Sequence, residues 1–392
     1  MSYKDASEWK RENPQGLRAA AAAAEFEALE EGAAEEKARQ EEAARAAAEE
    51  REQYYREHQS AGDKVQAFIN RVADRVNTPF IPTGFSKLDR ELDGGLYEGL
   101  YFIGAISSLG KTTFILQIAD QIAAAGHDVL FFTLEQSEFE LMAKSISRLT
   151  FEGCKGKTKN AKTARGITTY TFYENYSPEE KELLANAYSE YQQRTQGRLY
   201  FVEGVGDIGV ETGRESIKER VEKHIRATGR KPVIIIDYLQ ILAPADPRAS
   251  DKQNTDRAVN ALKRLSRDHK LTVIGISSFN RDNYYSPVNM SSFKESGAIE
   301  YSSDILLALQ PAGMGNEGED SRKKVDECKK EEKRAVELVI LKNRNGKTGG
   351  RFYYDYYSLF NCFKETDGGA DQSEAEPQRG GYTRGKNRNG VL

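Results

Sequence analysis

Residues 99–113, GLYFIGAISSLGKTT, constrain the fold of this chain more than any other segment. An apolar strand passes through a loop of small residues into a helix, where Phe114, Ile115, Ile118 and Ile122 recur at helical spacing. Backbone N–H groups of such a loop face an anion, and the helix N-terminus adds partial positive charge. The segment therefore predicts a loop that binds phosphate groups at the start of a helix.

The same loop supplies candidate ligands for a nucleotide. We expect Lys111 to contact the β- and γ-phosphates of ATP and the Thr112 hydroxyl to coordinate Mg²⁺. The pattern G-x-x-x-x-G-K-[ST] requires glycine where this chain has Ala105, and Gly104 stands one place early. The alternative, an ordinary strand-to-helix turn with a surface lysine, leaves the order of strand, loop and helix unexplained. The complete expected cradle is Ser107, Ser108, Leu109, Gly110, Lys111, Thr112 and Thr113.

Composition limits the class of protein. The 392 residues are 38% hydrophobic and 30% charged, so part of the chain is expected outside a core. The net charge of −4 leaves any nucleic-acid binding to a local patch. Three widely spaced cysteines favour neither a zinc site nor a disulfide framework and fit a reducing cytoplasm. We expect no signal peptide and no membrane span, because no apolar run is long enough.

Two helical segments are expected before the main domain. Residues 1–60 are rich in Ala, Glu and Arg and predict a solvated helix without a coiled-coil seam, with a docking arm for a partner as the alternative. Residues 61–82 contain a short amphipathic helix, a linker helix that must bury its apolar stripe on its own domain or on a neighbouring subunit. That stripe consists of Val65, Phe68, Ile69, Val72 and Val76.

From residue 83 to residue 365 the pattern alternates between strands and helices. The predicted strands are 100–106, 128–134, 198–203, 232–237, 271–277, 304–309, 335–342 and 350–357. The predicted helices are 112–125, 138–149, 178–195, 211–229 and 254–269. Several strands are continuously apolar, which predicts an α/β domain whose mostly parallel sheet is covered on both faces. We expect an exposed loop over 154–176, a charged excursion over 312–334 and a disordered tail over 366–392.

Two acidic residues follow predicted strands near the phosphate loop. Asp237 ends the strand VIIID, and such strand ends lie beside the phosphate loop in open α/β sheets, so Asp237 is a candidate for the Mg²⁺ shell. Glu135 follows the strand LFFT and can orient or deprotonate the attacking water. The alternatives are an ordinary strand-end aspartate and a glutamate that caps the next helix.

Late in the chain, ELVILKNRNGKTGGRFYYDY predicts a hairpin with Lys342, Arg344 and Lys347 near its turn. Cations at a hairpin tip are commonly solvated surface. In a ring of identical subunits, such an arginine can instead reach the γ-phosphate of the next subunit as an arginine finger.

Seven elements occur together in the order that is typical of one family. They are TGFSKLD, GLYFIGAISSLGKTT, FFTLEQS, IIIDYLQIL, SFNRD, FKESGAIEYSSDI and LKNRNGKTG. Over residues 64–363 the chain resembles the C-terminal RecA-like motor domain of DnaB-like replicative helicases. Ala105 is normal in that family. The motor portion is most similar to that of primase–helicase fusions from phages and mobile elements.

The resemblance implies an ATP- and Mg²⁺-dependent homohexamer that translocates on single-stranded DNA in a bacterial or phage-infected cytoplasm. It implies phosphate binding by Lys111 and Thr112, catalysis by Glu135 and metal binding by Thr112 and Asp237. It further implies that Lys342 and Arg344 act on the next subunit and that the 64–77 helix docks there. The implied DNA-gripping loop contains Lys294, Glu295 and Gly297.

Three departures from the family pattern stand out. Ser278 occupies the position where the family commonly has a glutamine that can sense the γ-phosphate, which leaves the coupling of hydrolysis to DNA open. In place of the family's globular N-terminal domain, which binds primase, residues 1–60 carry the pattern of the Ala- and Glu-rich helix. No cysteine precedes Cys154, so we expect no fused zinc-binding primase module. A primase or loader is therefore expected as a separate chain. The alternative functions are a RecA- or RadA-like recombination ATPase and a non-motor, ATP-dependent DNA-binding scaffold.

Overall fold

The computed structural model describes residues 14–75, 80–156, 158–204, 216–239, 248, 250–293, 296–315 and 320–368. The chain divides into two compact units, Met1–Pro79 and Phe80–Leu392. Within these described ranges, no helix is long and apolar enough to cross a membrane.

The second unit is built on one nine-stranded sheet, in the order β3-β2-β4-β5-β1-β6-β7-β8-β9. The first six strands in that order are parallel, and β7, β8 and β9 extend the sheet with antiparallel pairs. The strands are β1 Gly99–Ala105, β2 Val129–Thr133, β3 Leu199–Glu203, β4 Val233–Asp237, β5 Thr272–Ser278, β6 Ile305–Pro311, β7 Lys333–Asn343, β8 Arg351–Tyr357 and β9 Cys362–Thr366.

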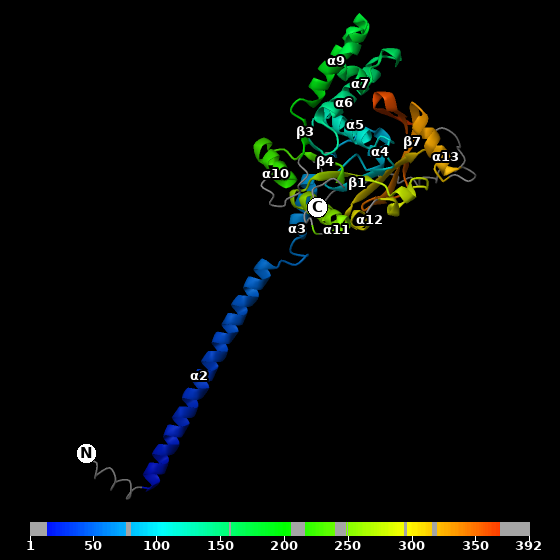
Figure 1. Ribbon diagram of the computed structural model, residues 1–392. Helices are drawn as coiled ribbons and strands as arrows, with labels where there is room; N and C mark the ends of the chain where they lie inside the picture. The colour runs from blue at the N-terminus through cyan, green and yellow to red at the C-terminus, as the bar shows by residue number, and fades with distance from the viewer. Residues whose placement is uncertain are drawn as a thin grey trace, which may run out of the picture. The chain divides into compact units, whose positions relative to one another are not determined.

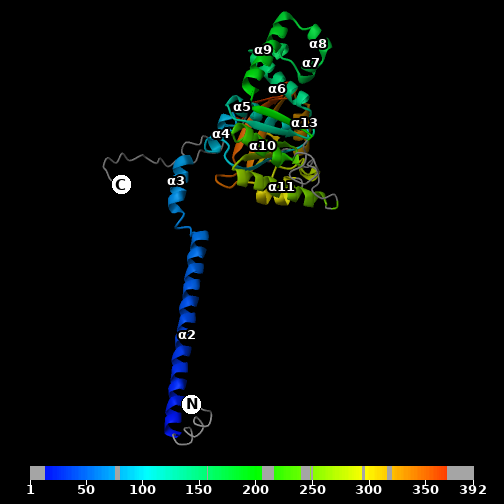
Figure 2. The ribbon, with the colours of Figure 1, turned by 90° about the vertical axis from the view of Figure 1, so that its left-hand side faces the viewer.

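Helices cover both faces of the sheet (Figures 1 and 2). Helices α5, α6 and α9 lie on one face and α11 on the other, while α12 packs against α11. The helices of this unit are α4 Ser86–Glu91, α5 Lys111–Ala124, α6 Glu138–Gly153, α7 Ala164–Thr168, α8 Tyr170–Glu174, α9 Pro178–Thr195, α10 Ile217–Thr228, α11 Asp251–His269, α12 Ser296–Ser302 and α13 Ser321–Lys330. The prediction of an α/β domain with a mostly parallel sheet is confirmed.

Burial explains the apolar sequence of the central strands. Every residue of β1, β2, β4 and β6 is buried, because helices or neighbouring strands cover them on all sides. Serines at four helix starts form capping boxes. In each box the serine hydroxyl accepts the backbone N–H of the residue three positions later, and the side chain of that residue accepts the backbone N–H of the serine. These serines are Ser137, Ser177, Ser216 and Ser250.

The expectation of an exposed loop over 154–176 is wrong in part. This segment contains α7 and α8, and Lys162 is only 6% exposed. The Lys162 ammonium forms an ion pair with Glu180 and lies 4.0 Å from the centre of the Tyr176 ring. Glu180 belongs to the first turn of α9, outside this segment, so the local composition of small and basic residues could not reveal the ion pair.

Two further elements were not expected. Helix α13 lies inside the charged segment 312–334, where Val325 and Cys328 are buried. Strand β9 extends the sheet beyond the predicted β7–β8 hairpin by pairing with β8. Both elements are short and polar in part, so their positions depend on the strands that receive them: α13 packs against β6 and β7, and β9 pairs with β8.

The first unit contains α2 Pro14–Glu57 and α3 Val65–Arg75. Figure 1 shows α2 as one continuous helix. Its large apolar side chains Phe26, Leu29 and Tyr54 are exposed, and its ion pair between Arg56 and Glu52 is also exposed. Exposed pairs of this kind contribute about 0.3–0.5 kcal/mol each.

Helix α3 carries the apolar stripe that the sequence predicts. Val65, Phe68, Ile69 and Val72 are 50%, 66%, 51% and 45% exposed. Spacings of three and four residues place them on one face of the helix. Val76, the last predicted member, lies outside the described residues.

Candidate nucleotide site

The predicted phosphate loop joins the C-terminal end of β1 to the N-terminus of α5. Ser108 and Gly110 both have left-handed backbone angles, with φ of 67° and 88°. A Cβ at position 110 would also lie 2.7 Å from the Tyr356 ring of β8. Gly110 is therefore required twice, by its own backbone and by the aromatic side chain beneath the loop.

The early glycine of the motif has a packing reason. A Cβ at Gly104 would overlap the rings of Phe279 and Phe293, which are both buried and lie 5.2 Å apart. Ala105, one residue later, fits as a fully buried side chain. The glycine at 104 thus makes room for an aromatic pair beside the neighbouring strand.

Lys111, the first residue of α5, points toward the C-terminal end of β5. Its Nζ donates a hydrogen bond to Ser278 Oγ at 3.0 Å. It also lies 5.4 Å from the centre of the Tyr238 ring, which follows β4. Residues at the ends of two neighbouring strands, β5 and β4, thus contact the ammonium that the sequence assigns to phosphate.

Asp237 ends β4 and is completely buried beside this loop. Neither of its carboxylate oxygens has a hydrogen bond within the described part of the chain. Burial raises the pKa of Asp237 to about 6, although the nearby Thr112 hydroxyl lowers that pKa. A buried carboxylate without a hydrogen bond, close to a helix-terminal threonine, fits the donor set that a hydrated Mg²⁺ requires.

Glu135 lies one strand away from Asp237. Thr133 of β2 is in register with Asp237, and the Leu134 N–H donates to the Asp237 carbonyl at 2.9 Å. Glu135 follows directly and is exposed. The alternative that Glu135 caps the next helix finds no support, because Ser137 and Glu140 form that cap.

A lysine that the sequence analysis did not identify lies next to these acids. Lys144 of α6 donates to Gln136 Oε1 at 2.6 Å. Burial lowers the pKa of Lys144, and the negative charge of Asp237 opposes that shift. Lys144 thus places a desolvated positive charge near Asp237 and Glu135. The sequence analysis missed it because no local motif distinguishes a lysine in the second turn of a helix.

Arg334 of β7 is a second missed residue. Its Nη1 donates to the Ser108 carbonyl at 2.7 Å, and its guanidinium lies 5.6 Å from the centre of the Tyr356 ring. Arg334 therefore braces the strained residue of the phosphate loop from a strand that is 226 residues away in sequence. Its only sequence signal is its place in a charged segment.

Lys342 and Arg344 lie at the opposite edge of the sheet, the edge that the N-terminal ends of the parallel strands form. The β7 residue Asn343 pairs with Ile305, and Ile305 pairs with Tyr101 near the start of β1. Tyr101 lies four positions before Ala105, so this level is roughly 13 Å from the C-terminal end of β1. The two cations are therefore not beside the phosphate loop of their own chain.

Both cations have partners at that edge. Arg344 Nη1 lies 3.2 Å from Asp304 Oδ1, and Lys342 Nζ donates to the Glu300 and Tyr301 carbonyls of α12 at 2.5 Å and 3.3 Å. Lys294 and Glu295 of the predicted DNA loop lie outside the described residues. Gly297 lies in the first turn of α12.

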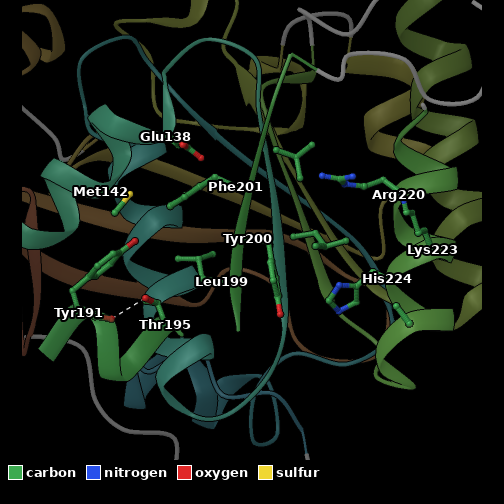
Figure 3. A pocket seen from close by; sticks show the side chains of 13 residues that line it. Glu138, Met142, Tyr191, Thr195, Leu199, Tyr200, Phe201, Arg220, Lys223 and His224 are labelled. Carbon is green, nitrogen blue, oxygen red and sulfur yellow. Dashed lines mark hydrogen bonds between the residues drawn. The ribbon is translucent and has the colours of Figure 1, made fainter. Parts of the chain in front are cut away.

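A cavity of about 500 Å³ lies elsewhere, along the edge strand β3. Figure 3 shows its walls, with α9 on one side and α10 on the other. They include Tyr191, Thr195, Leu199, Tyr200, Phe201, Arg220, Lys223 and His224. No residue of the phosphate loop lines this cavity, so it is separate from the nucleotide site.

Comparisons with known proteins agree with this geometry. The model of the DnaB-like helicase C-terminal domain matches residues 80–365. Replicative DNA helicase DnaB of Haemophilus influenzae is 26% identical over 288 residues, which is 72% of this chain and 54% of that protein. DnaB of Geobacillus stearothermophilus is 26% identical over 314 residues, with coverages of 78% and 61%. The chain thus spans only a little over half the length of these curated relatives.

Solved structures show the same fold. One solved ATPase domain superposes with a TM-score of 0.61 at 21% identity, covering 78% of this chain and 99% of that domain. A structure of a DnaB-like replicative helicase and its interactions with primase gives the same TM-score and identity, covering 67% of that chain. The fold is therefore the RecA-like ATPase fold.

Proposed function

The chain belongs to the DnaB-like helicase C-terminal domain family, and from this premise we propose that it is an ATP-driven DNA helicase. In this proposal it assembles as a homohexameric ring and translocates on single-stranded DNA to unwind duplex during replication. The observation that supports it most is the separation of the nucleotide ligands from the two cations at opposite edges of one sheet.

That separation favours an active site shared by two subunits. Lys111, Glu135 and Asp237 lie at or just beyond the C-terminal ends of β1, β2 and β4, which form one edge. Arg344 starts from the other edge and cannot reach its own phosphate loop, because roughly 13 Å of sheet lies between them. An arginine that completes the site must then come from the next subunit.

Each residue at the loop has a role in hydrolysis. Thr112 and Asp237 would hold the Mg²⁺ of bound ATP, and that ion would neutralise charge on the phosphates. Lys111 contacts the β- and γ-phosphates, and the Glu135 carboxylate accepts a proton from the attacking water. The exposed position of Glu135 beyond the end of β2 leaves room for that water.

The DNA contact is proposed for Lys294, Glu295 and Gly297, the last of which lies in the first turn of α12. The Glu300 and Tyr301 carbonyls, near the end of that helix, accept hydrogen bonds from Lys342. Backbone N–H groups and one lysine grip phosphates without reading bases, as a motor that moves along DNA requires. A primase or a loader on a separate chain is the proposed further partner, and the bacterial or phage-infected cytoplasm is the proposed place of action.

One experiment tests the proposal as a whole. We expect ATP turnover to rise when an unstructured oligodeoxynucleotide is added, and native mass spectrometry to give a hexamer under the same conditions. If DNA does not change the rate of ATP turnover, the helicase proposal is contradicted and the non-motor, ATP-dependent DNA-binding scaffold remains. DNA-stimulated turnover with strand exchange but no duplex unwinding would instead favour the recombination ATPase.

The apolar stripe of α3 is proposed to dock on the neighbouring subunit. Burying each of its large side chains contributes about 1.5–3 kcal/mol, so a charge in the stripe is expected to weaken the ring strongly. We expect Phe68→Asp to dissociate the hexamer in light scattering while the melting temperature of the ATPase domain stays unchanged. Gln66→Asp, on the polar face of the same helix, is the matched control. A Phe68→Asp chain that stays hexameric would place the stripe elsewhere.

A further inference from the structure

Lys144 of α6 is bonded to the turn that carries Glu135. Its Nζ donates a hydrogen bond to Gln136 Oε1 at 2.6 Å, and Gln136 directly follows Glu135 in the chain. The Gln136 carbonyl accepts a second hydrogen bond, from the hydroxyl of Thr133 at the end of β2. The side chain of Gln136 is thus held from α6, and its backbone is held from β2.

The rest of this turn is also anchored beside the nucleotide site. The Leu134 N–H donates to the Asp237 carbonyl at 2.9 Å, and Ser137 caps the start of α6. Glu135 lies between these two anchors, and its side chain is exposed. A general base must come within hydrogen-bond reach of the water that it deprotonates. The backbone of the turn therefore decides where the Glu135 carboxylate can reach.

The charge of Lys144 acts in the same direction as its hydrogen bond. Burial lowers the pKa of Lys144, and the negative charges of Asp237, Glu140 and Glu135 oppose that shift. Charges attract each other more strongly in a partly desolvated place than in bulk water. The attraction between the ammonium and these carboxylates therefore adds to the bond with Gln136.

A cavity adjoins this hydrogen bond. Lys144 and Gln136 both line a hollow of about 690 Å³ between α6 and α7. Both side chains are half-buried, so their bond lies beside open space and not in the packed core. Substitution of either side chain is therefore expected to leave the fold intact.

We propose that Lys144 is a positioning residue for ATP hydrolysis, which holds the Glu135 carboxylate near the attacking water through its bond to Gln136. This inference rests on the proposed function, because it takes Glu135 as the group that accepts the proton. Lys144 belongs to α6 and not to the phosphate loop. Its loss is therefore expected to slow the chemical step and to leave ATP binding unchanged.

The test begins with Lys144→Met, which removes the charge and the donor, and with Gln136→Leu, which breaks the same bond from the other side. Loss of a hydrogen bond to a charged group predicts a fall in kcat of about 10- to 100-fold for both variants. We expect the KM for ATP to stay within a factor of about two, because the phosphate ligands remain. Phosphate release gives both constants, and thermal melting checks the fold.

Two further variants serve as controls. Lys144→Arg keeps a cation and a donor at this position and should recover most of the lost rate. Lys159→Met removes an exposed lysine outside the site and should leave kcat and KM unchanged.

A double-mutant cycle with Glu135 separates positioning from a general structural role. Glu135→Gln already lacks the proton acceptor, so adding Lys144→Met to it is expected to lower kcat by less than about twofold. A lysine that only maintained the fold would lower kcat by the same factor in both backgrounds. The cycle is run in parallel with Gln136→Leu, which decides the question if Lys144→Met lowers the melting temperature.

The outcomes separate this inference from the proposed function. If the parent chain does not hydrolyse ATP, or if Glu135→Gln hydrolyses it at the parent rate, the proposed roles at the site fail and this inference fails with them. If both expectations hold, equal losses in the two backgrounds would overturn the role of Lys144 alone. A parent kcat in Lys144→Met, a loss confined to KM, or no recovery in Lys144→Arg would overturn it as well.

Discussion

Arg344→Ala is expected to lower ATP turnover of the ring by about 10³- to 10⁵-fold, the typical cost of losing an arginine finger. The physical reason is that a guanidinium stabilises the charge that develops on the transferred phosphoryl group. Turnover is measured at saturating ATP, with the affinity for DNA measured in parallel and expected to stay close to the parent. Lys347→Ala, an exposed cation in the same turn, is the control.

Mixed rings test whether Arg344 acts on the next subunit. Neither Arg344→Ala nor Lys111→Ala subunits should hydrolyse ATP alone. In a mixture, some interfaces join an intact phosphate loop to an intact arginine, so partial turnover should return. If verified mixed hexamers stay inactive, Arg344 does not act simply on its neighbour, or the ring needs every site intact. Normal turnover by Arg344→Ala alone would contradict the finger assignment outright.

Lys111→Ala and Glu135→Gln are expected to abolish hydrolysis in different ways. Removing Lys111 takes away a phosphate ligand, so both nucleotide affinity and turnover should be lost. Glu135→Gln keeps the cradle and removes the proton acceptor, which predicts a fall in turnover of about 10²–10⁴-fold with ATP affinity kept. A fluorescent ATP analogue measures binding, and phosphate release measures turnover.

The neighbouring carboxylate supplies the control for that pair. Glu138→Gln alters an exposed glutamate three residues along, in the first turn of α6, and should leave both measurements unchanged. If Glu135→Gln turns over ATP at the parent rate, another group activates the water.

The sequence predicted the elements whose pattern is local. The continuous apolar runs of β1, β2 and β4 and the strand–loop–helix order around Lys111 need no knowledge of the rest of the chain. The role of Lys111 followed from the phosphate-loop pattern, and the roles of Glu135 and Asp237 followed from their places at strand ends; all three roles stay predictions. The structure adds their registers and the burial of Asp237.

What the sequence could not predict depends on contacts between distant segments. Ser278 bonds Lys111 across 167 residues, and Arg334 reaches Ser108 across 226. Gly104 looked like a misplaced motif residue because the rings that need its space lie just beyond β5 and further along the chain. Each of these contacts exists only once the strand order places the partners side by side, and periodicity carries no information about that order.

The placement of Lys342 and Arg344 at the far edge of the sheet also limits the symmetry of the assembly. A twofold axis can pair the phosphate edge and the cation edge of two subunits reciprocally, but that interface is then complete in a dimer and adds no third subunit. A head-to-tail interface joins the phosphate edge of one subunit to the cation edge of the next, and such interfaces either close into a ring or continue as a filament. A closed ring then has as many complete sites as subunits, whereas a ring opened at one interface has one fewer. Opening the ring at one interface to admit a DNA strand would therefore inactivate one ATP site and leave the other sites able to hydrolyse ATP.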